Sequence, residues 1–169
     1  MAKRKQQIEV TVIIADASPI LTLARINRLE LLLSFECPVH IVDQVHYEVT
    51  KPENDPEGRV RASLQRMHNR ITIVETTVGT GFQVMRARDP SFSSKDLGEQ
   101  AVSEYAMRLV KTTGPSFVPL VLFEDPDVLT LPVASMKRVH LLNTSAWLYA
   151  MYEAGLLPDG LELMAAIDS

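Results

Sequence analysis

Cysteine is nearly absent from this chain of 169 residues, which contains only Cys37. A single cysteine cannot form a disulfide within the chain, so the sequence excludes a disulfide-stapled scaffold and suits a reducing cytoplasm. Long apolar runs are also missing, and none reaches the roughly 18 residues that a membrane-spanning helix needs. Residues 1–8 are basic, but no apolar segment with a small-residue cleavage site follows them. We therefore expect no secretory signal, no membrane association and a cytoplasmic location.

The sequence has fewer basic than acidic residues: 17 Lys and Arg against 21 Asp and Glu, which gives a net charge of −4. Non-specific affinity for nucleic acid comes from Lys and Arg that neutralise phosphates, so this balance argues against generic backbone binding. It does not exclude a nuclease, because carboxylates in a metal site add negative charge that bound cations neutralise. The basic residues are grouped at 3–5, 59–70, 86–88 and 137–138. Each group is either a solvated face or a contact for a nucleic-acid backbone.

Several catalytic motifs are missing as well. The four histidines show no metal-ligand spacing, which argues against zinc-dependent hydrolysis. Gly79-Thr-Gly81 lacks the Lys and the strand–loop–helix context of a phosphate-binding loop. No Gly-x-Ser-x-Gly motif is present, which removes the nucleophile elbow of serine hydrolases.

The chain does contain short apolar strands that alternate with helical stretches. Five apolar runs, several of them rich in β-branched residues, have the pattern of strands buried in a sheet: 10–15, 39–42, 71–74, 119–123 and 139–142. The helical patterns lie at 18–33 (two short helices), 44–50, 59–69, 96–111, 144–154 and 159–166. Residues 76–95 are rich in Thr, Gly, Ser and charge, and we expect an exposed connection there. This order predicts a single α/β domain over residues 1–169, a three-layer α/β/α sandwich with a central parallel sheet of about five strands.

Four acidic residues stand at the edges of these predicted strands and helices: Asp16, Glu48, Glu99 and Asp125. An open parallel sheet brings such edges together in one crevice. Clustered carboxylates there would hold hard divalent cations such as Mg²⁺ or Mn²⁺, and carboxylate-held metal pairs suit in-line phosphodiester cleavage. Asp127 lies close to Asp125 in sequence and would join the metal through water. The sequence therefore favours a metal-dependent nuclease.

Each acid also has a plainer interpretation. Asp16 could cap the helix that follows it, although Ser18 could do so equally well and leave Asp16 free. Glu48 could be an exposed helical glutamate. Asp125 and Asp127 could form an acidic surface loop, although such loops are uncommon directly after a buried strand.

Asp96 and Glu99 have the spacing of a capping box, in which the first side chain caps a helix and the second bonds back to the cap. That interpretation explains both acids without any chemistry. However, Gly98 between them weakens the first helical turn by roughly 1 kcal/mol relative to Ala. A glycine there makes sense if backbone or ligand must approach closely. We therefore expect Asp96 to cap the helix and Glu99 to bind the metal.

The acids lie in segments whose order and spacing are familiar. The segments are Ile13-Ile-Ala-Asp-Ala-Ser-Pro-Ile20, Val45-His-Tyr-Glu48, Asp96-Leu-Gly-Glu-Gln-Ala101 and Val121-Leu-Phe-Glu-Asp125. Across residues 10–157 this arrangement resembles the PIN-domain ribonuclease family. The later segment Asn143-Thr-Ser-Ala-Trp-Leu-Tyr-Ala is similar to the last helix of a subgroup close to the VapC-like toxins.

The resemblance implies a PIN-like α/β/α sandwich and a Mg²⁺- or Mn²⁺-dependent endoribonuclease. It implies acidic ligands at the following positions: Asp16, Glu48, Glu99 and Asp125. It also implies RNA as the substrate and, as in many relatives, a homodimer and an antitoxin protein that holds the toxin inactive. The chain departs from the pattern at Glu99, where Asp is commoner, and at Glu124-Asp-Pro-Asp127, which replaces Asp-Asp followed by basic residues. Two rival interpretations are a non-catalytic PIN-fold protein-interaction module and a DNA-directed nuclease.

Association is also indicated by the apolar segment 144–154. A helix that is apolar nearly all round needs a second burial surface besides the sheet. The leucine-rich segment 20–33 likewise has more apolar surface than packing on the sheet alone would bury. We expect a homodimer or a partner complex through one or both segments, unless the two cover each other within one monomer.

Overall fold

A computed structural model describes residues 9–169, so the predicted basic segment 1–8 lies outside the described residues. Five parallel strands form one sheet in the order β3-β2-β1-β4-β5. The strands are β1 (Val12–Ala15), β2 (Val39–Val42), β3 (Ile71–Val74), β4 (Pro119–Phe123) and β5 (His140–Asn143). This confirms the predicted parallel sheet of about five strands, and each strand falls within or close to one of the five apolar runs.

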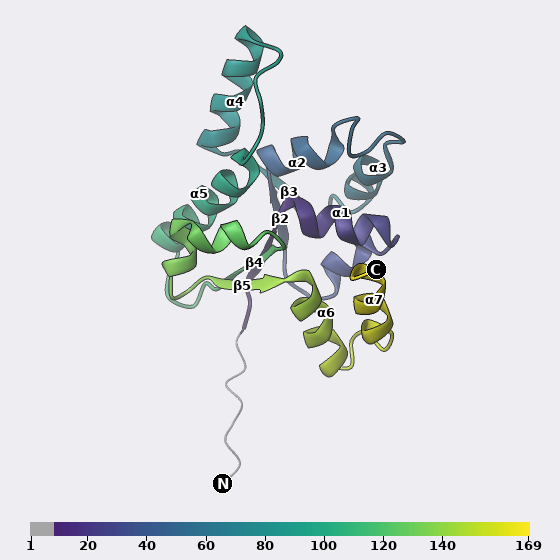
Figure 1. Ribbon diagram of the computed structural model, residues 1–169. Coiled ribbons are helices and arrows are strands. Elements are labelled where there is room, and N and C mark those ends of the chain that lie inside the picture. The colour runs from purple at the N-terminus through teal and green to yellow at the C-terminus, as the bar shows by residue number, and fades with distance from the viewer. Residues whose placement is uncertain (1–8) are drawn as a thin grey trace.

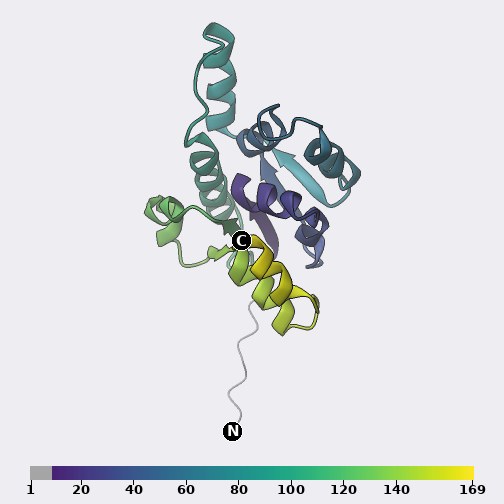
Figure 2. The ribbon, with the colours of Figure 1, turned by 45° about the vertical axis from the view of Figure 1, so that its right-hand side comes forward.

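Helices cover both faces of the sheet and complete the three-layer α/β/α architecture. Figures 1 and 2 show α1 and α3 on one side of the sheet and α5 on the other, while α4 projects beyond it. The helices are α1 (Ala17–Arg25), α2 (Asp43–Thr50), α3 (Arg59–Arg66), α4 (Thr77–Arg88), α5 (Leu97–Thr112), α6 (Thr144–Glu153) and α7 (Gly160–Ile167). Three short 3₁₀ helices complete the elements: η1 (Leu29–Leu33), η2 (Pro126–Thr130) and η3 (Pro132–Ser135).

The central strands β1 and β4 are buried along their whole length. They pair in parallel with Ala15 opposite Leu122. The segments that follow the two strands therefore leave the sheet side by side at its carboxyl edge. From β1 the chain continues by way of α1 to β2 on one side, whereas β4 joins β1 on the other. The strand order therefore reverses next to β1, which is where open α/β sheets form a crevice at their carboxyl edge.

Most of segment 76–95 is exposed, as expected, but it is not an irregular connection, because residues 77–88 form α4. Thr76 caps this helix, and its hydroxyl accepts a hydrogen bond from the Gly79 amide at 2.9 Å. The Glu104 carboxylate on α5 accepts two more, from the Thr77 and Val78 amides at 3.0 Å each. These acceptors satisfy three of the amides that a helix leaves unpaired at its start. The helix is thus stabilised from outside its own sequence.

The two short helices expected in the leucine-rich segment, with a break near Asn27, are present, although the second, η1, is a 3₁₀ helix. Helix α1 ends at Arg25, and Asn27 then adopts a left-handed conformation with φ of 58°. Asn tolerates that conformation better than most residues, so the chain turns there into η1.

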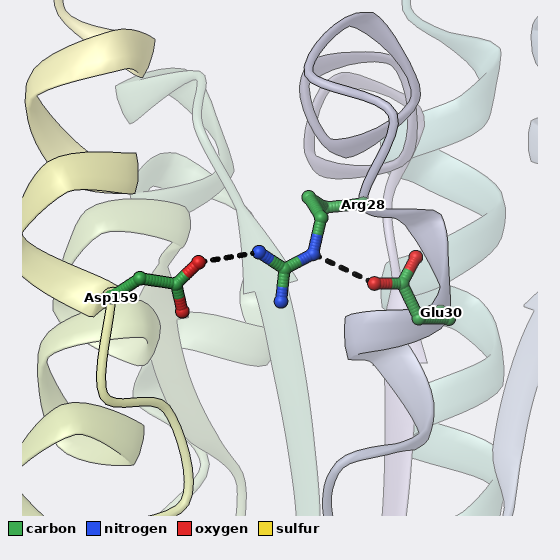
Figure 3. Close-up of polar contacts among 3 residues, drawn as sticks. All are labelled: Arg28, Glu30 and Asp159. Carbon is green, nitrogen blue, oxygen red and sulfur yellow. Dashed lines mark hydrogen bonds and ion pairs between the residues drawn. The ribbon is translucent and has the colours of Figure 1, made fainter.

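The C-terminal helices cover part of the apolar surface that the sequence leaves unexplained. Helix α7 packs on α6, and Trp147, Leu148 and Met151 of α6 are fully buried, although Tyr149 remains 47% exposed. The Arg28 guanidinium joins this region to η1 through ion pairs with Glu30 and Asp159 at 2.7 Å each (Figure 3). Much of the predicted second burial surface is therefore supplied within the chain. Across residues 9–169, no helix combines the length and the apolarity that crossing a membrane requires.

Candidate functional site: an acidic pocket at the carboxyl edge of the sheet

A cavity of about 390 Å³ lies at the carboxyl edge of the sheet, and we call it the acidic pocket. It is bordered by the start of α1, the end of α2, the segment before α5 and the turn after β4. Its lining residues are Asp16, Ala17, Ser18, Glu48, Lys51, Ser93, Ser94, Lys95, Asp96, Gly98, Glu99 and Asp125. The structure thus brings together Asp16, Glu48, Glu99 and Asp125, whereas Asp127 is not among the lining residues.

Asp16 continues the β1 strand into the pocket. Its amide donates to the Leu122 carbonyl at 3.0 Å, which fixes the residue between β1 and β4. The residue is 4% exposed and stands at the N-cap position of α1, but its side chain makes no capping hydrogen bond. Ser18 lies inside α1 and is not the cap, so the expectation that Ser18 could replace Asp16 as the cap is wrong. The Asp16 carboxylate is nevertheless free of capping, as the nuclease interpretation requires.

The pKa of Asp16 rises from its ordinary value of 3.8 to about 7. Burial is the largest cause, because it removes the water that stabilises the charged form. The negative charges of Glu99, Glu48 and Asp125 raise the pKa further, while a hydrogen bond from the Ala17 amide partly opposes the rise. The four acids therefore share one electrostatic environment that disfavours adding negative charge.

The carboxylates of Glu48 and Asp16 both lie next to Gly98, which has no side chain. A Cβ atom placed on Gly98 would lie 3.2 Å from Glu48 Oε2 and 3.9 Å from Asp16 Oδ1. A side chain at this position would therefore crowd both carboxylates. This geometry agrees with the close approach that the sequence suggests for a glycine in the first turn of the helix. The Asn54 amide group donates to the Glu48 main-chain carbonyl at 2.8 Å and steadies this end of α2.

Glu99 lies on the first turn of α5, partly buried, with its carboxyl group near the other acids. Burial raises its pKa most, followed by the charges of Asp125, Asp96, Asp127 and Glu48. Asp96 stands at the N-cap position of α5, but its φ is +61° and its side chain makes no capping hydrogen bond. The predicted capping by Asp96 is therefore wrong, because a left-handed N-cap does not present its carboxylate to the helix amides. Asp96 instead lines the acidic pocket as a fifth carboxylate.

The acidic side chains at the end of β4 make different contacts. Asp125 is exposed, lines the pocket, and accepts a hydrogen bond from the Asp127 amide at 2.9 Å. The Glu124 carboxylate instead accepts hydrogen bonds from the Thr22 and Thr144 hydroxyls, at 3.0 and 2.7 Å. Glu124 thereby links the end of β4 to α1 and α6, which holds the turn carrying Asp125 in place.

Two lysines at the rim of the pocket were missed by the sequence analysis. Lys51 follows α2 directly, and Lys95 precedes Asp96, so both lie among the acids. Of the basic groups singled out from the sequence, those within the described residues, at 59–70, 86–88 and 137–138, do not line this pocket. The closeness of the two lysines in sequence to the candidate acids could have pointed to them, because Lys51 is three residues from Glu48 and Lys95 is four residues from Glu99.

The donors at this site are oxygen atoms of carboxylates and hydroxyls, which suit hard divalent cations such as Mg²⁺ and Mn²⁺. Within residues 9–169, no group of three or more His, Cys, Asp or Glu side chains is already arranged to hold a metal ion. Carboxylates of like charge repel one another without a cation between them, so they are expected to spread apart.

A family model described as a PIN domain matches residues 12–91, a little under half of the chain. The matched segment contains β1 and α2, and with them Asp16 and Glu48, but it ends before Glu99 and Asp125. The match supports the PIN-domain family, whose members are generally nucleases that typically use divalent metals. No curated protein matches the chain.

Proposed function

We propose that this protein is an endoribonuclease that depends on Mg²⁺ or Mn²⁺. Its metal ligands are Asp16, Glu48, Glu99 and Asp125, and Asp127 contributes through water. One observation carries the proposal: four carboxylates from four distant segments line one pocket, and their repulsion helps to raise the Asp16 pKa to about 7. Such a cluster destabilises the metal-free fold, which makes sense if its purpose is to bind positive charge.

A bound divalent cation would activate water and stabilise the leaving oxygen of the phosphodiester. Residues of the pocket would position the RNA backbone, release a proton and keep space open for the metal. Lys51 and Lys95, at the pocket rim, hold phosphates of the RNA backbone on either side of the scissile bond. Asp16 carries its proton near neutral pH in the metal-free protein and releases it when the pocket gains positive charge. Gly98 keeps the space between Glu48 and Asp16 open.

RNA is the proposed substrate, in its single-stranded or looped form, because unstacked bases can be splayed out for recognition. The similarity of residues 143–150 to VapC-like toxins supports a toxin of a toxin–antitoxin pair that acts in the cytoplasm. Under this proposal the partners are an antitoxin protein and a second copy of the chain. Tyr149, Leu156 and Leu161 are about half exposed on or beside α6 and α7, which supports association through that surface.

The alternative is a PIN-fold interaction module without catalysis. It is favoured by the lack of a ready metal-binding group within residues 9–169 and by Glu99 in place of the commoner Asp. A longer carboxylate moves the position at which a metal would sit. This alternative predicts that the acidic pocket takes up no divalent cation at millimolar concentration.

Calorimetric titration with Mn²⁺, followed by cleavage assays on unstructured RNA and DNA of the same sequence, distinguishes these possibilities. We expect Mn²⁺ binding and RNA cleavage by the wild type, and loss of both in Asp125→Asn. Asp168→Asn is the matched control, because Asp168 is exposed at the end of α7 and outside the pocket. Wild-type protein that binds no Mn²⁺ would support the interaction module, and cleavage of DNA alone would support the DNA-directed nuclease.

A further inference from the structure

A second cavity, of about 300 Å³, is lined by residues of α2 and α4, and we call it the aromatic pocket. Figure 1 shows the positions of the two helices. The lining residues of the aromatic pocket are Asp43, Gln44, Tyr47, Gly79, Phe82, Gln83, Arg86 and Ala87. Ligand pockets commonly span ~300–1,000 Å³, so this one has room for a single small planar group. Tyr47 of this pocket and Glu48 of the acidic pocket are consecutive residues of α2, so the same helix contributes to both pockets.

Aromatic side chains of this pocket form a tilted cluster with one guanidinium group. The rings of Tyr47 and Phe82 lie 5.0 Å apart between centroids, and the ring of Phe92 lies 6.1 Å from that of Phe82. The Arg86 guanidinium lies over both inner rings, 5.5 Å from the Tyr47 centroid and 5.9 Å from that of Phe82. Arg86 is exposed, so one face of its planar group is open to a further planar partner.

Gln44 supplies a polar group at the base of the pocket. The residue is 2% exposed, and its side-chain nitrogen has no hydrogen-bond partner among the described residues. A buried N–H without a partner costs about 1–3 kcal/mol, so such groups call for an explanation. The adjacent Asp43 carboxylate accepts hydrogen bonds from the Gln44 main-chain amide at 2.9 Å and from the Thr76 amide and hydroxyl at 3.0 and 2.7 Å, but not from the Gln44 side chain. A bound ligand with an acceptor atom would satisfy Gln44.

The pocket is held open by a rigid junction between α2 and α4. Asp43 at the start of α2 binds Thr76, and Thr76 in turn caps α4 through the Gly79 amide. A Cβ atom on Gly79 would lie only 2.1 Å from Asp43 Oδ2, so no other residue permits this approach. The geometry of the pocket is therefore fixed by the backbone rather than by side chains that could collapse into it.

We propose that the aromatic pocket binds an unpaired nucleobase of the RNA strand whose backbone occupies the acidic pocket. The base stacks on the open face of the Arg86 guanidinium, which itself lies over the Tyr47 ring, while the Gln44 amide donates to a carbonyl oxygen or ring nitrogen on the edge of the base. Aromatic and guanidinium planes together with an amide are the groups that recognise single-stranded bases. This inference rests on the proposed ribonuclease function and adds to it a contact that selects the cleavage position.

Moving a single abasic site along an unstructured RNA tests this contact directly. We expect the wild type to lose about tenfold or more in kcat/KM when the abasic nucleotide falls at one fixed distance from the cleaved bond, because stacking of one base contributes binding of that order. Arg86→Ala should lose a similar factor on intact RNA and become insensitive to the abasic site. Arg86→Lys keeps the charge but not the planar group, and should behave like Arg86→Ala.

Arg88→Ala is the control, because it removes the same charge from the same helix outside the pocket. Robust cleavage that tolerates an abasic site at every position would overturn the base pocket and leave the ribonuclease proposal intact. A wild type that cleaves no RNA would instead overturn the ribonuclease proposal. In that event, fluorescence anisotropy with the same RNAs decides the pocket: weaker binding by Arg86→Ala than by Arg88→Ala supports it, and equal binding overturns it.

Discussion

Replacing the Asp16 carboxylate by an amide should stabilise the metal-free protein at pH 8 and leave its stability nearly unchanged below pH 4. The folded protein holds the Asp16 proton up to a pKa of about 7, whereas the unfolded chain releases it near the ordinary value of 3.8. Between these values the native state binds more protons than the unfolded state, so stability falls as pH rises. Below 3.8 both states are protonated, and above 7 the full destabilisation is present.

The magnitude follows from the gap between the two pKa values. Each unit corresponds to about 1.4 kcal/mol, so the ionised Asp16 destabilises the fold at pH 8 by up to ~4 kcal/mol. Asp16→Asn removes that charge and keeps the shape of the side chain. For a chain of this size ~1 kcal/mol corresponds to a melting-temperature change of ~2–4 °C, which puts the expected gain at several degrees or more.

Urea unfolding in the presence of a chelator, at pH 4, 6 and 8, measures this dependence. Asp16→Asn should unfold at higher urea than the wild type at pH 8, with about two-thirds of that stability gain at pH 6, and at nearly the same urea at pH 4. Asp168→Asn should follow the wild type throughout, because Asp168 is exposed and outside the acidic pocket. An Asp16→Asn protein that matches the wild type at all three pH values would refute the electrostatic account of the pocket.

Adding Mn²⁺ should reverse the order of stability, since a ligand that binds only the native state raises its stability. The wild type should gain stability with increasing Mn²⁺ at pH 8, and Asp16→Asn should gain much less. A wild type whose unfolding midpoint does not move with Mn²⁺ would count against the metal site while leaving the pH argument standing.

Three further outcomes are expected. Glu99→Gln should weaken Mn²⁺ binding in calorimetry by tenfold or more while the circular dichroism spectrum stays unchanged, and unaltered affinity would remove Glu99 from the ligand set. Gly98→Ala should weaken Mn²⁺ binding as well, because its Cβ would lie 3.2 Å from Glu48 Oε2, and thermal unfolding should show less than the ~1 kcal/mol that Ala ordinarily adds to a helix. Sedimentation equilibrium should give a dimer that Tyr149→Lys converts to a monomer, and a wild-type monomer mass at micromolar concentration would contradict it.

The strands were the most predictable part of the fold. Residues 39–42, 71–74 and 119–123 form strands with the bounds expected from the sequence, because short runs rich in β-branched and other apolar residues favour a place in a sheet. Helix α4 was missed for the opposite reason. Its first turns contain Gly79 and Gly81, which are poor helix formers, and two of its amides are paired by Glu104, about 26 residues away. A stabilising contact from another helix leaves no local pattern to detect.

The candidate acids could be located because each one adjoins a predicted strand or helix end, and parallel strands bring their carboxyl ends together whatever the loops do. Capping could not be assigned in the same way, because a cap depends on one residue's backbone angles. Asp96 has the spacing of a capping box, yet a φ of +61° turns its carboxylate away from the amides of α5 and leaves it lining the pocket. The positions of Lys51 and Lys95 could not be predicted either, because they depend on the path of the segment after α2 and of the segment before α5. Sequence therefore predicts which charges meet at a sheet edge, while the roles of residues in the adjoining turns have to be taken from their conformation.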